Sequence, residues 1–221
     1  MKKKCNIFRF INRKRHAAGF GVHSPFAFNL ILDTINTPHS YYIYNENKRK
    51  IEKAGLEKQA NIKNAELIFR LINRFNSKNI LEIGSGVGIN TLYISTHSKQ
   101  TKMICVEQKE EKIKIAQSLL ALKLKNISFT NVLPIMKNSF DAIIWDLKEY
   151  PQQEETLNTI KTTIKSGGFI VVNHINSCQQ NSNIWQKILQ LDTATMSFDL
   201  GAIGISFFKP SLPKLNYDLY F

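Results

Sequence analysis

The chain has 221 residues and a formal net charge of +13 at pH 7, with 43% hydrophobic and 10% aromatic residues. This composition can supply a packed core and excludes a wholly disordered chain. No apolar run approaches the roughly 20 residues that a membrane helix needs. The length favours one α/β domain with an N-terminal extension over two full domains. We expect residues 1–60 to form a basic arm with a helical extension, and residues 61–221 to form the main domain.

The positive charge is uneven along the chain. Before Gly19 there are several Lys and Arg residues and no acidic residue. Such an arm suits RNA, an anionic membrane surface or a phosphorylated substrate, and a solvated tail explains it equally well. Cys5, Cys105 and Cys178 are widely spaced and odd in number. They fit reduced thiols in a cytoplasmic protein better than a disulfide framework or a zinc site.

The extension contains two predicted helices. Ser24-Pro25 is typical of a helix start, and apolar residues then recur at helical spacing as far as Ile35. A second, highly charged helix is expected over residues 45–58, although Gly55 weakens it.

From residue 61 onward, predicted helices and strands alternate. The first helix carries an apolar face from Ala65 to Phe75. Further helices are expected at about 88–98, 110–124, 152–165 and 183–191. Strands are expected at 79–83, 102–107, 127–130, 140–145, 168–172, 193–198 and 202–208. This alternation favours a doubly wound, mostly parallel sheet, and the short turn at 199–201 predicts that the last two strands pair antiparallel.

The strongest local signal is the glycine-rich turn that follows the first of these strands. The turn consists of Gly84, Ser85, Gly86, Val87 and Gly88. Spaced glycines between a strand and a helix let the backbone approach a ligand closely. Glu82 lies inside the preceding strand, and Glu107 ends the next strand, where a carboxylate can accept both hydroxyls of a ribose. Together these features indicate an adenosine cofactor.

The spacing of the glycines separates the candidate cofactors. A dinucleotide fingerprint requires G-x-G-x-x-G, but Ile89 stands at the position of the third glycine. No Walker lysine follows the turn, which disfavours a nucleotide triphosphatase. The pattern E-x-G-x-G-x-G, with its acidic residue inside the strand, favours S-adenosylmethionine.

This segment resembles motif I of the class I S-adenosylmethionine-dependent methyltransferases, and the predicted element order resembles their seven-stranded, Rossmann-like sheet. Within that superfamily the chain is most similar to the catechol O-methyltransferase-like branch. The segments 21–26, 41–42 and 198–201 also resemble an uncharacterised bacterial group of such proteins. The resemblance implies transfer of a methyl group from S-adenosylmethionine to an oxygen of a small molecule, with S-adenosylhomocysteine as the product.

The resemblance also implies roles for individual residues. The glycine-rich turn lines the methionine and ribose part of the cofactor, and Glu82 belongs to the same motif. Glu107 holds the ribose hydroxyls and Gln108 lies beside the adenine. Asn131 matches the position whose polar side chain often reads the adenine amine. Asp146, which follows the strand at 140–145, reaches the same crevice.

Asp146 and His174 are the candidate catalytic residues. In the metal-dependent O-methyltransferases that the chain resembles, the corresponding strand ends carry Asp, Asp and Asn ligands for Mg²⁺ or Ca²⁺. This chain has Asp146, Asn173 and His174 there, a poor set for a hard cation, so no metal ligand is assigned. His174 suits a general base because the imidazole pKa lies near neutrality. A hydrogen bond to a neighbouring loop explains His174 equally well, and a turn cap is the alternative for Asp146.

Two other functions stay open at this point. The basic arm suits an RNA methyltransferase, although no Asn-Pro-Pro-Tyr-type motif accompanies it. Asn173-His174 and Leu147-Lys148 depart from the related group, which suits a methyltransferase fold kept as a binding protein without turnover. The intact glycine-rich turn and Glu107 favour an enzyme with a small-molecule acceptor.

Overall fold

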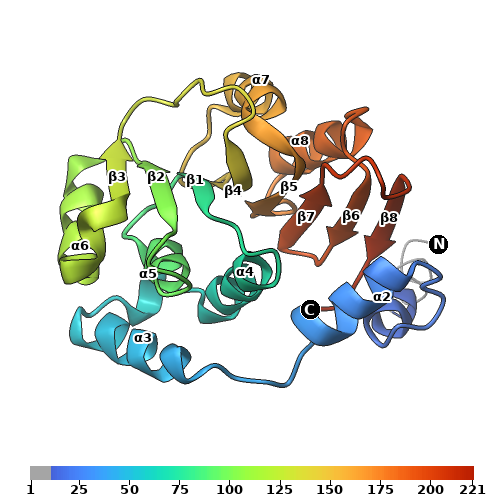
Figure 1. Cartoon of the computed structure of the whole chain (residues 1–221), viewed down its shortest axis with the longest axis horizontal. Coiled ribbons are helices and arrows are strands. Elements are labelled where there is room, and N and C mark those ends of the chain that lie inside the picture. The colour runs from blue at the N-terminus through green and yellow to red at the C-terminus, as the bar shows by residue number, and fades with distance from the viewer. Residues whose placement is uncertain (1–10) are drawn as a thin grey trace.

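A computed structural model describes residues 11–221, apart from the side chains of residues 122 and 123. Its framework is a sheet with helices packed on both faces (Figure 1). The strands of this described part are β1 (Asn79–Ile83), β2 (Lys102–Val106), β3 (Ile127–Thr130), β4 (Phe140–Asp146), β5 (Ile164–Asn173), β6 (Met196–Asp199), β7 (Ile203–Phe207) and β8 (Leu215–Asp218). They lie in the order β3-β2-β1-β4-β5-β7-β6-β8. All neighbours pair parallel except β7, which is antiparallel to both β5 and β6.

The helices alternate with these strands as the sequence predicts. They are α2 (Pro25–Leu30), α3 (Tyr42–Lys53), α4 (Ile62–Arg74), α5 (Ile89–Ser95), α6 (Glu110–Leu120), α7 (Gln153–Thr163) and α8 (Gln179–Gln190), with a π-helix at Ile31–Ile35 and 3₁₀ turns at Glu57–Gln59 and Ala121–Asn126. The Ser24 hydroxyl accepts a hydrogen bond from Ala27 N and so caps α2. On α4, the predicted apolar face is buried, with Ala65, Ile68 and Ile72 fully covered.

The expectation of seven strands is wrong, because the described chain contains an eighth, β8. This strand pairs parallel with β6. Its sequence, Leu-Asn-Tyr-Asp, is too short and too polar to show a strand period. Tyr217 holds it in place by stacking on Phe198 of β6, with 5.4 Å between the ring centroids. The antiparallel pairing of β6 and β7 is confirmed.

The helices before residue 60 pack into the core of the main sheet. Leu30 and Ile31 are fully buried in the same cluster as Phe207 of β7. Tyr44 of α3 is 5.7 Å from Tyr93 of α5, between ring centroids, within another cluster. These segments therefore complete the main core, and the boundary between residues 60 and 61 stays a prediction about domain organisation.

The first part of the predicted basic arm, residues 1–10, lies outside the described residues. Within the described part, Arg13 is bound by the C-terminal half of the sheet. Its Nη2 lies 3.1 Å from Asp199 Oδ1, and its Nε donates to the carbonyl of Leu219 at 2.8 Å. Between residues 11 and 221, no helix has both the length and the apolar character needed to cross a membrane.

Candidate cofactor and catalytic site

A cleft of about 310 Å³ opens where the carboxyl ends of β1, β4 and β5 meet. Parallel strands present these ends at one edge of a sheet, which is where open α/β folds bind ligands. From these ends the cleft is lined by Gly84, Ser85, Gly86, Asp146, Asn173 and His174. The chain therefore brings together the first half of the glycine-rich turn and both candidate catalytic residues.

The floor of the cleft requires glycine at position 84. Gly84 has a φ of +78°, and a Cβ there would lie 2.9 Å from the Cβ of Glu149 and 3.1 Å from the carbonyl oxygen of Asp146. A side chain would clash with the β4–α7 loop as well as straining the backbone. The turn therefore packs closely against the loop that carries Glu149, and its close approach to a ligand stays a prediction.

Glu107 fixes the far side of the glycine-rich turn. Its carboxylate accepts a hydrogen bond from Gly86 N at 2.8 Å and another from Lys109 N at 3.0 Å. The residue is only 2% exposed. This arrangement ties the end of β2 to the turn after β1, so the carboxylate and the turn form one unit.

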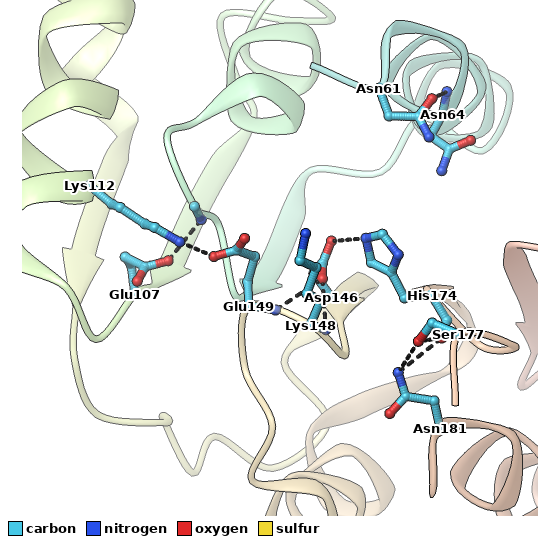
Figure 2. A network of polar contacts seen from close by, with 11 residues as sticks. Asn61, Asn64, Glu107, Lys112, Asp146, Lys148, Glu149, His174, Ser177 and Asn181 are labelled. Carbon is cyan, nitrogen blue, oxygen red and sulfur yellow. Dashed lines mark hydrogen bonds and ion pairs between the residues drawn. The ribbon is translucent and has the colours of Figure 1, made fainter. Parts of the chain in front are cut away.

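The side chains of Asp146 and His174 face each other across the ends of β4 and β5. Asp146 Oδ2 lies 3.4 Å from His174 Nε2, while Oδ1 accepts hydrogen bonds from the backbone N–H groups of Lys148 and Glu149 (Figure 2). The carboxylate therefore also caps the following turn, which is the role that the sequence left open beside a catalytic one. The hydrogen bond to Asp146 raises the pKa of His174 above its ordinary value, and burial opposes that rise.

The backbone at His174 is held in an unusual conformation. Its φ is +64°, in the left-handed region that β-carbon-bearing residues rarely adopt. The buried Asn181 of α8 donates from Nδ2 to the carbonyl of His174 at 3.0 Å and to Ser177 Oγ at 2.8 Å. Gln153 Nε2 in turn donates to Asn181 Oδ1 at 2.7 Å. Sequence reasoning missed this support, because it joins residues from three separate elements.

A further ion pair bridges the cleft, which the sequence did not indicate. Lys112 of α6 reaches past Glu107 to the carboxylate of Glu149, which follows β4 (Figure 2). Both residues border the cleft. The Glu149 side chain also lies close to the glycine-rich turn, because a Cβ on Gly86 would lie 3.8 Å from Glu149 Cδ. No local sequence spacing links positions 112 and 149, so only the fold brings their charges together.

The polar atoms of the cleft fit an S-adenosylmethionine molecule. Ser85 Oγ and Asn173 Oδ1 are buried, line the cleft and have no hydrogen-bond partner in the described part of the chain. Buried polar atoms are costly when unpaired, so both suit a ligand with its own donors and acceptors. The ammonium and carboxylate of a methionine provide such groups.

Five predicted cofactor residues lie outside the lining of this cleft, and one of them is Glu107, described above. Gly88 caps α5, and a Cβ there would clash with Ala116 at 2.8 Å. Gln108 and Asn131 are exposed beyond the ends of β2 and β3. Glu82 is 1% exposed and accepts a hydrogen bond from Thr91 Oγ1 at 2.6 Å. Their assignment to the cofactor stays a prediction, with Glu82 and Gly88 placed to act through the shape of the turn.

The side chains that could bind a metal ion at the ends of β4 and β5 are those that the sequence indicates, Asp146, Asn173 and His174. Among residues 11–221, no group of three or more His, Cys, Asp or Glu side chains is arranged to hold a metal ion. The absence of metal ligands stays a prediction.

The buried carboxyl of Glu82 makes stability depend on pH. Burial raises the pKa of Glu82 from 4.5 to about 7. Because the folded-state pKa lies above the unfolded value, its contribution to stability is full below pH 4.5 and is lost as the pH rises through about 7. We expect Glu82→Gln to remove this loss, which amounts to about 3 kcal/mol. Urea unfolding of both proteins at pH 5 and pH 8 measures it, and an identical pH dependence in the two would contradict it.

The chain is similar to known methyltransferases. A family model described as a methyltransferase domain matches residues 74–203, which is more than half of the chain. A search of curated proteins finds no match. These comparisons give no support to an RNA-modifying enzyme or to a binding protein without turnover.

Solved structures share the fold. A putative caffeoyl-CoA O-methyltransferase from Staphylococcus aureus is 15% identical, with a TM-score of 0.63 over 76% of this chain and 97% of that one. A putative O-methyltransferase from Klebsiella pneumoniae is 14% identical, with a TM-score of 0.62 over 78% and 92%. An O-methyltransferase from Bacillus cereus in complex with S-adenosylhomocysteine is 15% identical, with a TM-score of 0.60 over 78% and 93%. The family model covers more than half of the chain, and the chain belongs to the methyltransferase domain family.

Proposed function

We propose that the chain methylates an oxygen of a small-molecule acceptor, with His174 as the general base. The observation that carries this proposal is the Asp146–His174 pair in the same cleft as Gly84 and Gly86. The proposed cofactor, S-adenosylmethionine, supplies an electrophilic methyl group. A hydroxyl acceptor must lose its proton as the new bond to oxygen forms. The O-methyltransferases that share the fold make an oxygen acceptor the first to test.

Each partner of the pair has a proposed task. Asp146 Oδ2 faces Nε2 of His174, which favours a proton on Nε2 and leaves Nδ1 able to accept one from the acceptor hydroxyl. The resulting imidazolium is stabilised by the carboxylate. We assign the tautomer on this basis. Asn181 acts on the ring indirectly, by holding the left-handed backbone at His174.

The cofactor is proposed to lie along the glycine-rich turn. The turn and Ser85 hold its methionine part, and Glu107 accepts from the ribose hydroxyls. Gln108 and Asn131, at the ends of β2 and β3, contact the adenine. The Lys112–Glu149 pair borders the same space.

A cytoplasmic location stays a prediction. The two described cysteines are both free thiols, with Cys105 buried and Cys178 exposed.

The direct test is chemical identification of the product. The purified protein is incubated with S-adenosylmethionine and a panel of phenols and hydroxy acids, and mass spectrometry measures methyl ethers and S-adenosylhomocysteine. We expect a methyl ether whose formation needs His174. Methylation of amines or thiols alone would contradict an oxygen acceptor.

The pH dependence of the rate tests the role of the pair. We expect kcat/KM for the acceptor to rise with pH through an inflection above 6.5, because the base must be neutral and Asp146 raises the pKa of His174. In Asp146→Asn the stabilising charge is lost, so the inflection should move to lower pH. Initial rates between pH 5 and 9 at saturating cofactor measure both curves. An inflection at the same pH in both proteins would remove Asp146 from this role.

A further inference from the structure

The carboxylate proposed to hold the ribose is covered. Glu107 does not line the cofactor cleft, and it is only 2% exposed. Backbone N–H groups of Gly86 and Lys109 take up part of its hydrogen-bonding capacity. An ionised carboxylate can accept about four hydrogen bonds, so capacity for two ribose hydroxyls remains. Glu107 therefore has the capacity to bind a ribose, but a ribose needs a way to reach it.

The side chain of Glu149 lies along the glycine-rich turn. A Cβ on Gly84 would lie 2.9 Å from the Cβ of Glu149. Further along the turn, a Cβ on Gly86 would lie 3.8 Å from both Cγ and Cδ of Glu149 and 3.9 Å from its Oε2. The cofactor is proposed to lie on this same surface of the turn. Because two groups cannot fill one space, a cofactor there requires the Glu149 side chain to move.

Lys112 holds Glu149 in this position. Its side chain extends from α6 past Glu107, and its ammonium forms an ion pair with the carboxylate of Glu149 (Figure 2). The side chains of Lys112 and Glu149 are 25% and 29% exposed, and ion pairs that water can reach are weak. The contact can therefore favour one arrangement of the two side chains and still open when a ligand competes for the space.

The backbone that carries Glu149 is fixed. Glu149 N donates to Asp146 Oδ1 at 3.1 Å, and Tyr150 N donates to the carbonyl of Asp146 at 2.9 Å. Tyr150 is buried, and its carbonyl accepts a hydrogen bond from Trp145 Nε1 at 3.2 Å. Opening of the Lys112–Glu149 pair therefore needs only new rotamers of two long side chains, without displacement of the β4–α7 loop.

We propose that Lys112 and Glu149 form a latch, which closes over Glu107 and the glycine-rich turn until S-adenosylmethionine displaces it. The proposal rests on the proposed function, because it requires the cofactor to lie along this turn. The closed latch competes with the cofactor for one surface, so the apparent affinity is reduced by the fraction of molecules in which the latch is open. Salt screens partly exposed charges, so a high salt concentration shifts the latch toward its open form.

Calorimetric titration of the full chain with S-adenosylhomocysteine tests the latch. Lys112→Met and Glu149→Gln each remove one charge of the pair at nearly constant side-chain length. We expect each variant to bind roughly two- to fivefold more tightly than the wild type at about 50 mM NaCl, as a partly exposed ion pair allows. The double variant should bind as tightly as either single variant, because the loss of one charge already opens the latch. At about 500 mM NaCl all four proteins should approach the same affinity.

Lys187 and Glu154 provide a matched control. They form another ion pair, between α8 and α7, and neither residue lines the cleft. Lys187→Met and Glu154→Gln should therefore keep the wild-type affinity at both salt concentrations.

The other outcomes separate the latch from the cofactor site. Weaker binding by Lys112→Met or Glu149→Gln would overturn the latch, because the lost side chain would then be a direct contact of the ligand. Unchanged affinity in both variants would also overturn it, and in either case the cofactor site would stand. Absence of binding in the wild type and in every variant would overturn the proposed cofactor site and the latch together.

Discussion

His174→Asn is expected to lower kcat by roughly 10²- to 10⁴-fold, the usual contribution of a positioned general base. Asparagine tolerates the left-handed backbone found at this position, where φ is +64°, so the local fold should persist. Its amide cannot accept a proton near neutral pH. The affinity for S-adenosylhomocysteine should change little, because the proposed role of His174 concerns the acceptor. Single-turnover rates and calorimetric titration measure the two effects separately.

The same substitution at an exposed histidine serves as the control. His39 lies in the loop before α3, so His39→Asn should keep the wild-type rate. An unchanged kcat in His174→Asn would remove His174 as the base. A loss of cofactor affinity as large as the loss of rate would instead place it in the cofactor site.

Glu107→Ala is expected to weaken the binding of S-adenosylhomocysteine by roughly 10- to 100-fold. Hydrogen bonds to a charged group contribute about 1.5–3 kcal/mol each, and this carboxylate has two tasks. It accepts from Gly86 N at 2.8 Å, which fixes the turn, and it is the proposed acceptor for the ribose hydroxyls. The alanine variant loses both tasks at once. Calorimetric titration measures the change in Kd.

Glu111→Ala provides the matched control, since Glu111 lies exposed in the first turn of α6. It should bind the cofactor as the wild type does. Thermal unfolding monitored by circular dichroism separates a local effect from a loss of fold. Wild-type affinity in a folded Glu107→Ala protein would contradict the assignment of the ribose site to β2.

The sequence by itself determined the class of fold and the position of the glycine-rich turn. Apolar periodicity located most helices and strands, and the spaced glycines located the turn between β1 and α5. The convergence of Asp146 and His174 was also predictable, because the carboxyl ends of adjacent parallel strands share one edge. These features depend on local spacing and on a general rule of parallel sheets.

Only the tertiary structure decided which side chains meet across that edge. Lys112 and Glu149 pair although no sequence spacing relates them, and Asn181 supports His174 from another helix. β8 becomes a strand because β6 offers it a partner, not because its own residues favour one. Such contacts depend on long-range packing, since a short polar segment gains the free energy of a strand only through its neighbour.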